Sequence, residues 1–269
     1  ESEGLRIASR IGKALPAGYI EDSSAQIAAA DVAQLDALTG PDDLRLSLQP
    51  IHRDGADGLR MKLYRQLKDI PLSDVLPMME NMGLRVIAER PYRLMVDDAP
   101  VYVQDFEVES TVGAIDAAAA SAAFADAFAR VWHGEAENDG FNRLVLATGL
   151  DWRQVSMLRG YCKYLLQIGV PFSQAYVEGT FNRYPLLARL IVELFEARFE
   201  PAPAADKATA DAQLAQFKAL AGDAATVKLL EGVVKARGGS RDARMALVHD
   251  TLVKLLDGVS SLDEDRILR

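Results

Sequence analysis

Alternating apolar and polar residues predict a β-sheet in the first half of the chain. Apolar residues alternate with polar ones from Leu44 to Leu48 and again through Leu59, Met61 and Leu63, which is the two-residue period of a strand. The stretch between them, HRDGADG, is polar and rich in glycine, so we expect a hairpin with a long loop. Further strands are predicted from Leu84 to Glu89 and from Val101 to Glu109.

Helical spacing predicts the elements around these strands. A helix with Ser73 as its cap and Gly83 as its end separates the strand pairs, and an alanine-rich helix runs from Ile115 to Trp132. Arg90-Pro91 bends the third strand or places it at a sheet edge. This order predicts a four-stranded antiparallel sheet with helices on one face, an α+β sandwich. It looks like a permuted ferredoxin-like or ACT-type domain.

Helical periodicity dominates the second half, whose central helix runs from Asp151 to about Gly169. Gln154 stands three residues after Asp151, as in a capping box, and Pro171 prevents the helix from continuing. To its apolar face we assign Val155, Leu158, Cys162 and Leu165, widened by Tyr161 and Ile168. To its solvated face we assign Arg153, Ser156, Arg159, Lys163 and Gln167.

Other helices surround this one. Asp139 caps a helix that Gly149 closes, Ser173 caps another, and a further helix runs from Pro185 to Phe199. In that last helix we expect buried Leu187, Leu190, Ile191, Leu194 and Phe195, and exposed Arg189, Glu193 and Glu196. A proline-rich linker at Glu200–Asp206 precedes three more predicted helices, at about Ala210–Leu220, Thr226–Lys235 and Arg241–Leu256.

These elements divide the chain into three regions. Residues 1–42 hold two N-terminal helices, predicted at Leu5–Leu15, where Pro16 stops the first, and at Ser24–Leu38. Residues 43–134 form the ACT-like α+β domain, and residues 135–269 form a helical domain. The predicted fold class is therefore α+β, with an ACT- or ferredoxin-like antiparallel sheet domain followed by an all-helical region.

Composition limits the functions open to this chain. Its 269 residues carry a net charge of −9, which argues against sequence-independent binding of nucleic acid. No apolar run is long enough to cross a membrane. Cys162 is the only cysteine, which excludes an internal disulfide and favours a cytoplasmic location. The chain begins at Glu1 without an initiator Met, so we expect a piece of a longer protein.

Motifs for catalysis are missing from the sequence. A dinucleotide site needs closely spaced glycines after a strand, yet no G-x-G-x-x-G occurs, and Gly238-Gly239 lies between two predicted helices. One metal candidate is the stretch His133–Asp139, with one His and three carboxylates, but its irregular spacing favours a solvated turn. We therefore assign no catalytic, cofactor-binding or metal residues. His52, in the predicted loop, and His249 are expected at the surface.

A second candidate is a set of aromatic and basic residues on the central helix: Trp152, Arg159, Tyr161, Lys163 and Tyr164. These side chains could contact an effector or another domain. The alternative, which we favour for Trp152 and Tyr161, places the aromatic rings in the core with their polar ends at its edge.

The segment from Phe124 to Pro185 resembles the helical segment that precedes the catalytic domain in the large bacterial NAD-specific glutamate dehydrogenases. LRVIAERPYRL and the ending VSSLDEDRILR resemble the same family. The matching residues in the helical segment are Trp132, Asp139, Gly140, Asn142, Arg143, Trp152, Arg153, Arg159, Tyr161, Tyr164, Gln167, Phe172, Ser173 and Gln174.

This resemblance implies a non-catalytic regulatory or scaffolding section of an enzyme that oxidatively deaminates L-glutamate to 2-oxoglutarate and ammonia with NAD. The NAD site and the catalytic lysine would lie beyond Arg269, so we expect no cofactor in this chain. The implied partners are the enzyme's own catalytic domain and further copies in a homo-oligomer. ACT-type domains also bind amino-acid effectors, here at HRDGADG or the Asp69–Leu72 turn; a purely structural domain is the alternative. A different hypothesis is a stand-alone interaction or effector-binding module with no enzymatic parent.

Overall fold

The computed structural model describes residues 10–53, 56–200 and 207–269; for residues 52, 53, 56 and 57 it describes the backbone alone. The chain forms two compact units, Glu1–Asn138 and Asp139–Arg269, called here the N-terminal and C-terminal units. None of the described helices is long and apolar enough to cross a membrane. The predicted α+β class, an antiparallel sheet domain followed by helices, is confirmed.

The N-terminal unit is built on one antiparallel sheet with strand order β1-β2-β4-β3. Its strands are β1 (Leu44–Arg53), β2 (Ala56–Gln66), β3 (Leu84–Val96) and β4 (Ala99–Ser110). The predicted long loop between the first two strands is wrong, because backbone pairing continues until Arg53 faces Ala56. Pairing of backbone groups does not need apolar side chains, so the polar composition of HRDGADG was misleading. His52 consequently lies on β1 rather than in a loop.

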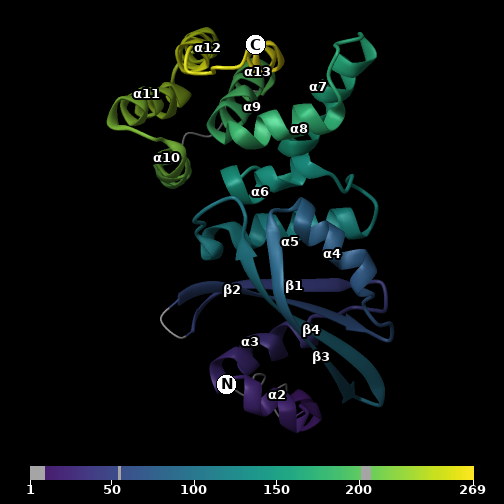
Figure 1. Ribbon diagram of the computed structural model, residues 1–269. Helices are drawn as coiled ribbons and strands as arrows, with labels where there is room; N and C mark the ends of the chain where they lie inside the picture. Colours follow the sequence, from purple (N-terminus) through teal and green to yellow (C-terminus); the bar gives the residue numbers. More distant parts are fainter. Residues whose placement is uncertain (1–9, 54–55, 201–206) are drawn as a thin grey trace. The chain divides into compact units, whose positions relative to one another are not determined.

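Two helices cover one face of this sheet, as predicted (Figure 1). They are α4 (Leu72–Asn81), which contacts β3, and α5 (Ala117–Trp132), which contacts β1. The N-cap of α4 is Pro71 rather than Ser73, whose hydroxyl instead bonds to the neighbouring Asp74. Pro91 lies in β3, an edge strand, which was one of its two predicted placements.

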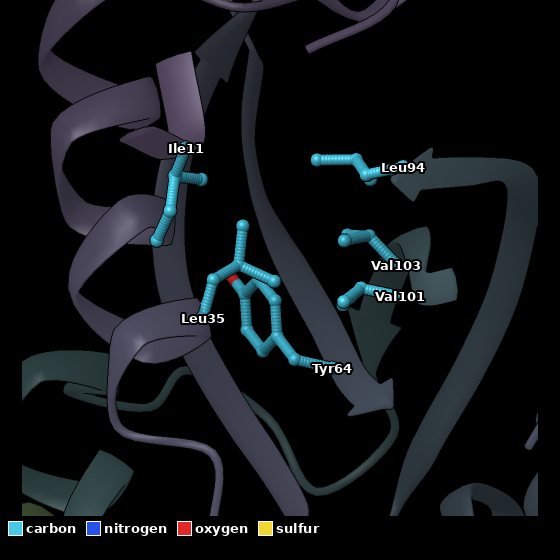
Figure 2. Close-up of a cluster of buried hydrophobic side chains, with 6 residues drawn as sticks. All are labelled: Ile11, Leu35, Tyr64, Leu94, Val101 and Val103. Carbon is cyan, nitrogen blue, oxygen red and sulfur yellow. The ribbon is translucent and has the colours of Figure 1, made fainter. Parts of the chain in front are cut away.

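The opposite face of the sheet is also covered, contrary to the prediction of helices on one face. Helices α2 (Ala17–Asp22) and α3 (Ala25–Asp36) lie there together with the short helix η1 (Gly12–Ala14) (Figure 1). Figure 2 shows part of the resulting core, in which side chains before η1, on α3 and on three strands meet: Ile11, Leu35, Tyr64, Leu94, Val101 and Val103. Residues 5–9 of the predicted Leu5–Leu15 helix lie outside the described residues, and the described part contains η1; α2 was not predicted.

Local capping signals place the first helices of the C-terminal unit. Asp139 accepts a bond from the Phe141 amide at the start of η2 (Gly140–Asn142), which continues into α6 (Arg143–Thr148). Gly149 ends α6 with φ +69°, a conformation that favours glycine. Asp151 and Gln154 form the predicted capping box of α7 (Trp152–Gln167). Ser173 caps α8 (Gln174–Arg183), also as predicted.

The predicted bounds of α9 (Pro185–Phe199) are confirmed, and further helices follow it in the chain. They are α10 (Lys207–Leu220), α11 (Ala224–Lys235), α12 (Arg241–Leu256) and α13 (Leu262–Leu268), with the short η3 (Ala236–Gly238) before α12. Helix α12 makes the most extensive packing against α9. Helix α13, capped by Ser261, was not predicted. Most of the predicted linker, residues 201–206, lies outside the described residues.

Several face assignments in these helices are wrong. Arg159, Arg189 and Glu193 were placed on solvated faces, yet all three are buried. Tyr161 and Ile168 were placed on the apolar face of α7, yet 45% and 58% of their surfaces are exposed. Helical periodicity identifies opposite sides of a helix, but it does not show which charged side chains find a buried partner.

Candidate functional site

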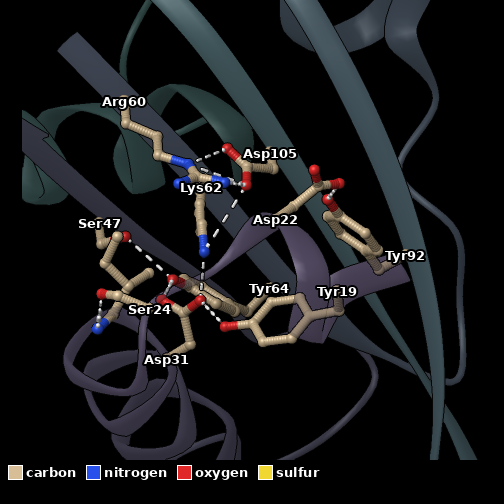
Figure 3. A network of polar contacts seen from close by, with 11 residues as sticks. Tyr19, Asp22, Ser24, Asp31, Ser47, Arg60, Lys62, Tyr64, Tyr92 and Asp105 are labelled. Atoms are coloured by element: carbon tan, nitrogen blue, oxygen red, sulfur yellow. Dashed lines mark hydrogen bonds and ion pairs between the residues drawn. The ribbon is translucent and has the colours of Figure 1, made fainter. Parts of the chain in front are cut away.

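A buried network of charges and phenols lies between the sheet and helices α2 and α3. Asp31, on α3, is 1% exposed and accepts hydrogen bonds from Tyr19, Lys62 and Tyr64 (Figure 3). The Tyr64 hydroxyl oxygen lies 2.6 Å from Asp31 Oδ1. Lys62 Nζ also lies 3.6 Å from an oxygen of Asp105. These contacts join residues that are far apart in the sequence.

Strand geometry explains why these side chains meet. Every second residue of β2 points to the same face, so Arg60, Lys62 and Tyr64 share the side that α2 and α3 cover. Lys62 is paired in register with Asp105 of β4, and Arg60 Nε donates to the same carboxylate at 2.8 Å. Two cations and two carboxylates therefore balance their charges in a region where an unpaired charge would be costly.

Burial sets the protonation of the phenols in this region. Burial raises the pKa values of Tyr19 and Tyr64 above the ordinary value, and the Asp31 carboxylate raises both further. Burial and a hydrogen bond to Asp22 raise the pKa of Tyr92 to about 12. All three phenols consequently remain protonated donors at neutral pH. We interpret the network as structural, because its groups are paired with one another rather than presented to a ligand.

A polar cavity of about 510 Å³ lies at the edge of this network. Its volume falls in the range of small-molecule sites. It is lined by cations and carboxylates together with a few apolar side chains: Glu21, Asp22, Ile27, Pro50, Ile51, Arg60, Arg90, Asp105 and Glu107. Such a mixed lining suits a zwitterion, since guanidinium groups bind carboxylates and carboxylates bind ammonium groups.

In the C-terminal unit, Arg159 holds the start of η2 against α7. Its Nε lies 2.6 Å from Asp139 Oδ2, and its terminal nitrogen NH2 lies 2.8 Å from Asp139 Oδ1 and 2.9 Å from Asn142 Oδ1. The guanidinium group is therefore a buried anchor within this unit. The predicted role for Arg159 on a solvated docking face does not fit this position.

The aromatic residues of α7 occupy different environments. Trp152 is half-buried, whereas Tyr161 and Tyr164 are exposed, so the favoured core placement of Tyr161 is wrong. The rings of Tyr161 and Phe195 are nearly perpendicular, with 6.2 Å between their centroids. An apolar cavity of about 310 Å³ lies beneath, lined in part by Leu158, Cys162 and Phe195. Burial raises the pKa of the Cys162 thiol to about 11, which makes it a weak nucleophile.

Among the described residues, no group of three His, Cys, Asp or Glu side chains is arranged to hold a metal ion. In the stretch His133–Asp139, Glu135 pairs with Arg130 and Asp139 pairs with Arg159. These pairs are those of an interhelical turn, the interpretation that the spacing favoured. His249 is exposed on α12 and lies 3.4 Å from Asp250.

Sequence reasoning missed the buried charges on both units. Lys62 stands at a strand position that the alternating pattern of β2 assigns to solvent, Asp31 lies on α3 and Asp105 lies on β4. The buried Glu193 stands among charged neighbours on α9. The helical segment predicted before the sheet was one available signal, because helices on both sides of the sheet in sequence can cover both of its faces. The identity of the charge partners has no local signal, because they are distant in sequence.

Comparison with known proteins identifies three regions of the chain. Residues 43–120 match the family described as glutamate dehydrogenase, ACT3 domain. Residues 1–38 match glutamate dehydrogenase, helical motif 2, and residues 136–201 match glutamate dehydrogenase, helical motif 3.

Individual relatives agree with these matches. The chain is 45% identical over 203 residues to the NAD-specific glutamate dehydrogenase of Halomonas elongata. It is 38% identical over 201 residues to that of Pseudomonas aeruginosa and 35% identical over 221 residues to that of Mycobacterium tuberculosis. These alignments cover 74–80% of the chain but only 12–13% of each relative. The resemblance to the large NAD-specific glutamate dehydrogenases is thereby confirmed.

Proposed function

We propose that this chain, related to the ACT3 and helical-motif regions of the NAD-specific glutamate dehydrogenases, is a non-catalytic regulatory or scaffolding section of such an enzyme. The observation that carries the proposal is the combination of matches: three successive regions correspond to ACT and helical motifs, while the alignments span only 12–13% of the relatives. The chemistry would then belong to the rest of the parent protein.

The parent enzyme would oxidise L-glutamate to 2-oxoglutarate and ammonia and pass a hydride to NAD. The residues of this chain do not fit an NAD site, because the sequence has no glycine-rich turn through which backbone amides could approach a pyrophosphate. The section formed by this chain would contact the catalytic region of the parent enzyme and other copies of the parent in a cytoplasmic homo-oligomer. The net charge of −9 makes nucleic acid an unsuitable partner.

The proposal is tested by measuring catalysis and assembly separately. The isolated chain is assayed for NAD binding by calorimetry and for glutamate oxidation, and the full-length parent is assayed with and without residues 1–269. We expect no binding and no turnover by the isolated chain, and altered assembly or regulation of the shortened parent. Stoichiometric NAD binding by the isolated chain would overturn the proposal, as would a shortened parent with unchanged assembly, kcat and effector response.

A second candidate function is the binding of an amino-acid effector, for which the polar cavity beside Arg60 is the supporting observation. Arg90 would bind the carboxylate of the amino acid, and Glu21 or Glu107 would bind its ammonium group. Of the two loops expected from the sequence, the Asp69–Leu72 turn does not line this cavity. Most side chains of HRDGADG lie outside the described part of the chain, and its neighbour Ile51 does line the cavity.

The effector hypothesis is tested by thermal unfolding of the isolated chain with each of the common amino acids. One or a few of them should raise the unfolding temperature, and Arg90→Ala should remove the effect. Arg93→Ala is the matched control, because Arg93 is exposed on the same strand and does not line the cavity. A full screen without any shift, or a shift that survives Arg90→Ala, would rule out this cavity as the effector site.

A further inference from the structure

The C-terminal unit buries a carboxylate that is surrounded by donors from four helical segments. Glu193, on α9, has no exposed surface. Its Oε1 accepts from the Gln213 amide of α10 and from Arg189 NH2 at 3.3 Å. Arg237, on η3, donates from NH2 to both oxygens, at 3.2 and 3.1 Å. The carboxylate therefore already has several donors before the last neighbour, on α12, is considered.

That last neighbour is Arg244, which adds a further guanidinium group beside a carboxylate whose two oxygens already accept hydrogen bonds. Arg244 NH2 lies 3.6 Å from Glu193 Oε2, which is within ion-pair range but longer than a good hydrogen bond. A second carboxylate, that of Glu196, lies 3.7 Å from Arg237 NH2. Three guanidinium groups thus face two carboxylates, which leaves one positive charge in excess within this cluster.

Unsatisfied donors accompany the excess charge. Within these three arginines, four buried guanidinium nitrogens have no hydrogen-bond partner in the described structure: Nε of Arg189, Arg237 and Arg244, and NH2 of Arg244. Arg189 and Arg244 are only 7% and 3% exposed. An unpaired charge in such surroundings is costly, and an arginine does not relieve the cost by losing its proton, because its pKa exceeds ~12. Buried groups of this kind point to an occupant such as an ion.

We propose that Arg189, Arg237 and Arg244 bind one small monovalent inorganic anion of the chloride class. The excess of one positive charge matches a monovalent ion, whereas a phosphate or dicarboxylate would bring more negative charge than the cluster can balance. Because the three arginines come from α9, η3 and α12, the bound anion links the packing of the last helices to α9. This inference does not depend on the proposed function of the chain.

Thermal unfolding of the isolated chain tests the anion site. Sodium chloride is exchanged for sodium gluconate at constant ionic strength, so that general screening is unchanged. An anion that binds only the folded state raises the unfolding temperature progressively with its concentration. We expect this rise with chloride and bromide but not with gluconate. Coincident unfolding temperatures in chloride and gluconate at every concentration would overturn the proposal, as would a larger rise with sulfate at matched ionic strength.

Substitution locates the effect. Arg244→Met removes the excess charge while keeping an unbranched side chain, so the variant should lose its chloride dependence. Arg241→Met is the matched control on the same helix, since Arg241 is exposed, and it should keep the dependence of the unsubstituted chain. Retention of the full chloride effect in Arg244→Met would place the bound ion elsewhere and overturn the assignment.

A second measurement keeps the proposal testable if Arg244→Met does not fold. Crystals of the unsubstituted chain grown in sodium bromide are examined for anomalous scattering. A bromide peak within contact distance of Arg244 and Arg237 would support the site. A cluster filled only by water, without anomalous signal, would contradict it.

Discussion

Arg159 and Asp139 form a two-point ion pair inside the C-terminal unit, with nitrogen–oxygen distances of 2.6 and 2.8 Å. Asp139 also caps η2, where its Oδ1 accepts from the Phe141 amide at 3.1 Å. One carboxylate therefore fixes both the start of a helix and the position of α7 twenty residues later. The parallel geometry of the two bonds is the strong form of an arginine–carboxylate contact.

Removing this arginine should severely destabilise the C-terminal unit. Arg159→Ala leaves the largely buried Asp139 carboxylate without its guanidinium partner, so we expect a loss of about 3–5 kcal/mol in the free energy of unfolding. The loss can be measured by urea unfolding followed through Trp152 fluorescence in a Trp132→Phe background, since the other tryptophan lies in the N-terminal unit. Arg241→Ala, at an exposed position, should change the same free energy by about 0.5 kcal/mol or less. Equal small effects of the two substitutions would show that Arg159 is not buried in solution.

Features that depend on residues close together in the sequence were predicted correctly, whereas features that depend on contacts between distant residues were not. The capping box of Asp151 and Gln154 was predictable because its two residues are three positions apart and their chemistry is local. The burial of Arg159 was not, because it depends on Asp139, which belongs to another helix. For the same reason the helix bounds of α9 were predictable, whereas the environment of Glu193 on that helix was not.

The candidate site shows the same division. The alternating apolar residues predicted the sheet, and helical spacing predicted a helix before it. Neither pattern showed that the N-terminal helices cover the second face of the sheet and border the polar cavity. Lys62 and Asp105 look like solvent-facing residues until α3 is placed over them and brings Asp31. A charged residue in an alternating strand is compatible with solvent or with a buried partner, and only the tertiary contact decides between them.

Cys162 should be unreactive in the folded chain. Burial raises the pKa of its thiol from 9.0 to about 11, so the reactive thiolate is scarce near neutral pH. Alkylation by iodoacetamide should be slow below pH 9 and should accelerate toward pH 11, while urea-unfolded chain reacts with the ordinary pH dependence. Because Cys162 is the only cysteine, the total incorporated label reports this position alone.

The same pKa shift links Cys162 to stability at high pH. A thiol whose pKa is raised in the folded state gives a stabilising contribution that is complete below the unfolded pKa, near 9, and is lost as the pH rises through about 11. Cys162→Ala should therefore show a smaller loss of stability between pH 9 and pH 11 than the unsubstituted chain. Identical pH profiles for the two chains would contradict a buried, protonated thiol.

Truncating the apolar face of α7 should distinguish buried from half-buried leucines. Leu158 has no exposed surface, so Leu158→Ala should cost about 2–5 kcal/mol of unfolding free energy. Leu165 is only half-buried, and Leu165→Ala should cost less than Leu158→Ala. Chemical unfolding followed through Trp152 measures both. A larger cost at Leu165 would show that the cavity-lining side of α7 is more tightly packed than the structure indicates.

The last prediction concerns Asp31 and Lys62, whose ion pair fastens α3 to the sheet. Lys62 is 2% exposed, and Lys62→Met leaves Asp31 with only its two phenol donors among the contacts named above, so we expect a loss of about 3–5 kcal/mol in the N-terminal unit. The double variant Asp31→Leu with Lys62→Met removes both charges and should lose less than the sum of the single changes, because no charge of the pair is left unmatched. Lys68→Met is the control, since its pair with Asp42 is exposed and screened by solvent, so its loss should change the free energy of unfolding far less. Unfolding followed through Trp132 in a Trp152→Phe background measures the full cycle. If the two single costs simply added in the double variant, the ion pair would contribute no coupling, and the attachment of α2 and α3 would rest on the apolar cluster around Leu35 alone.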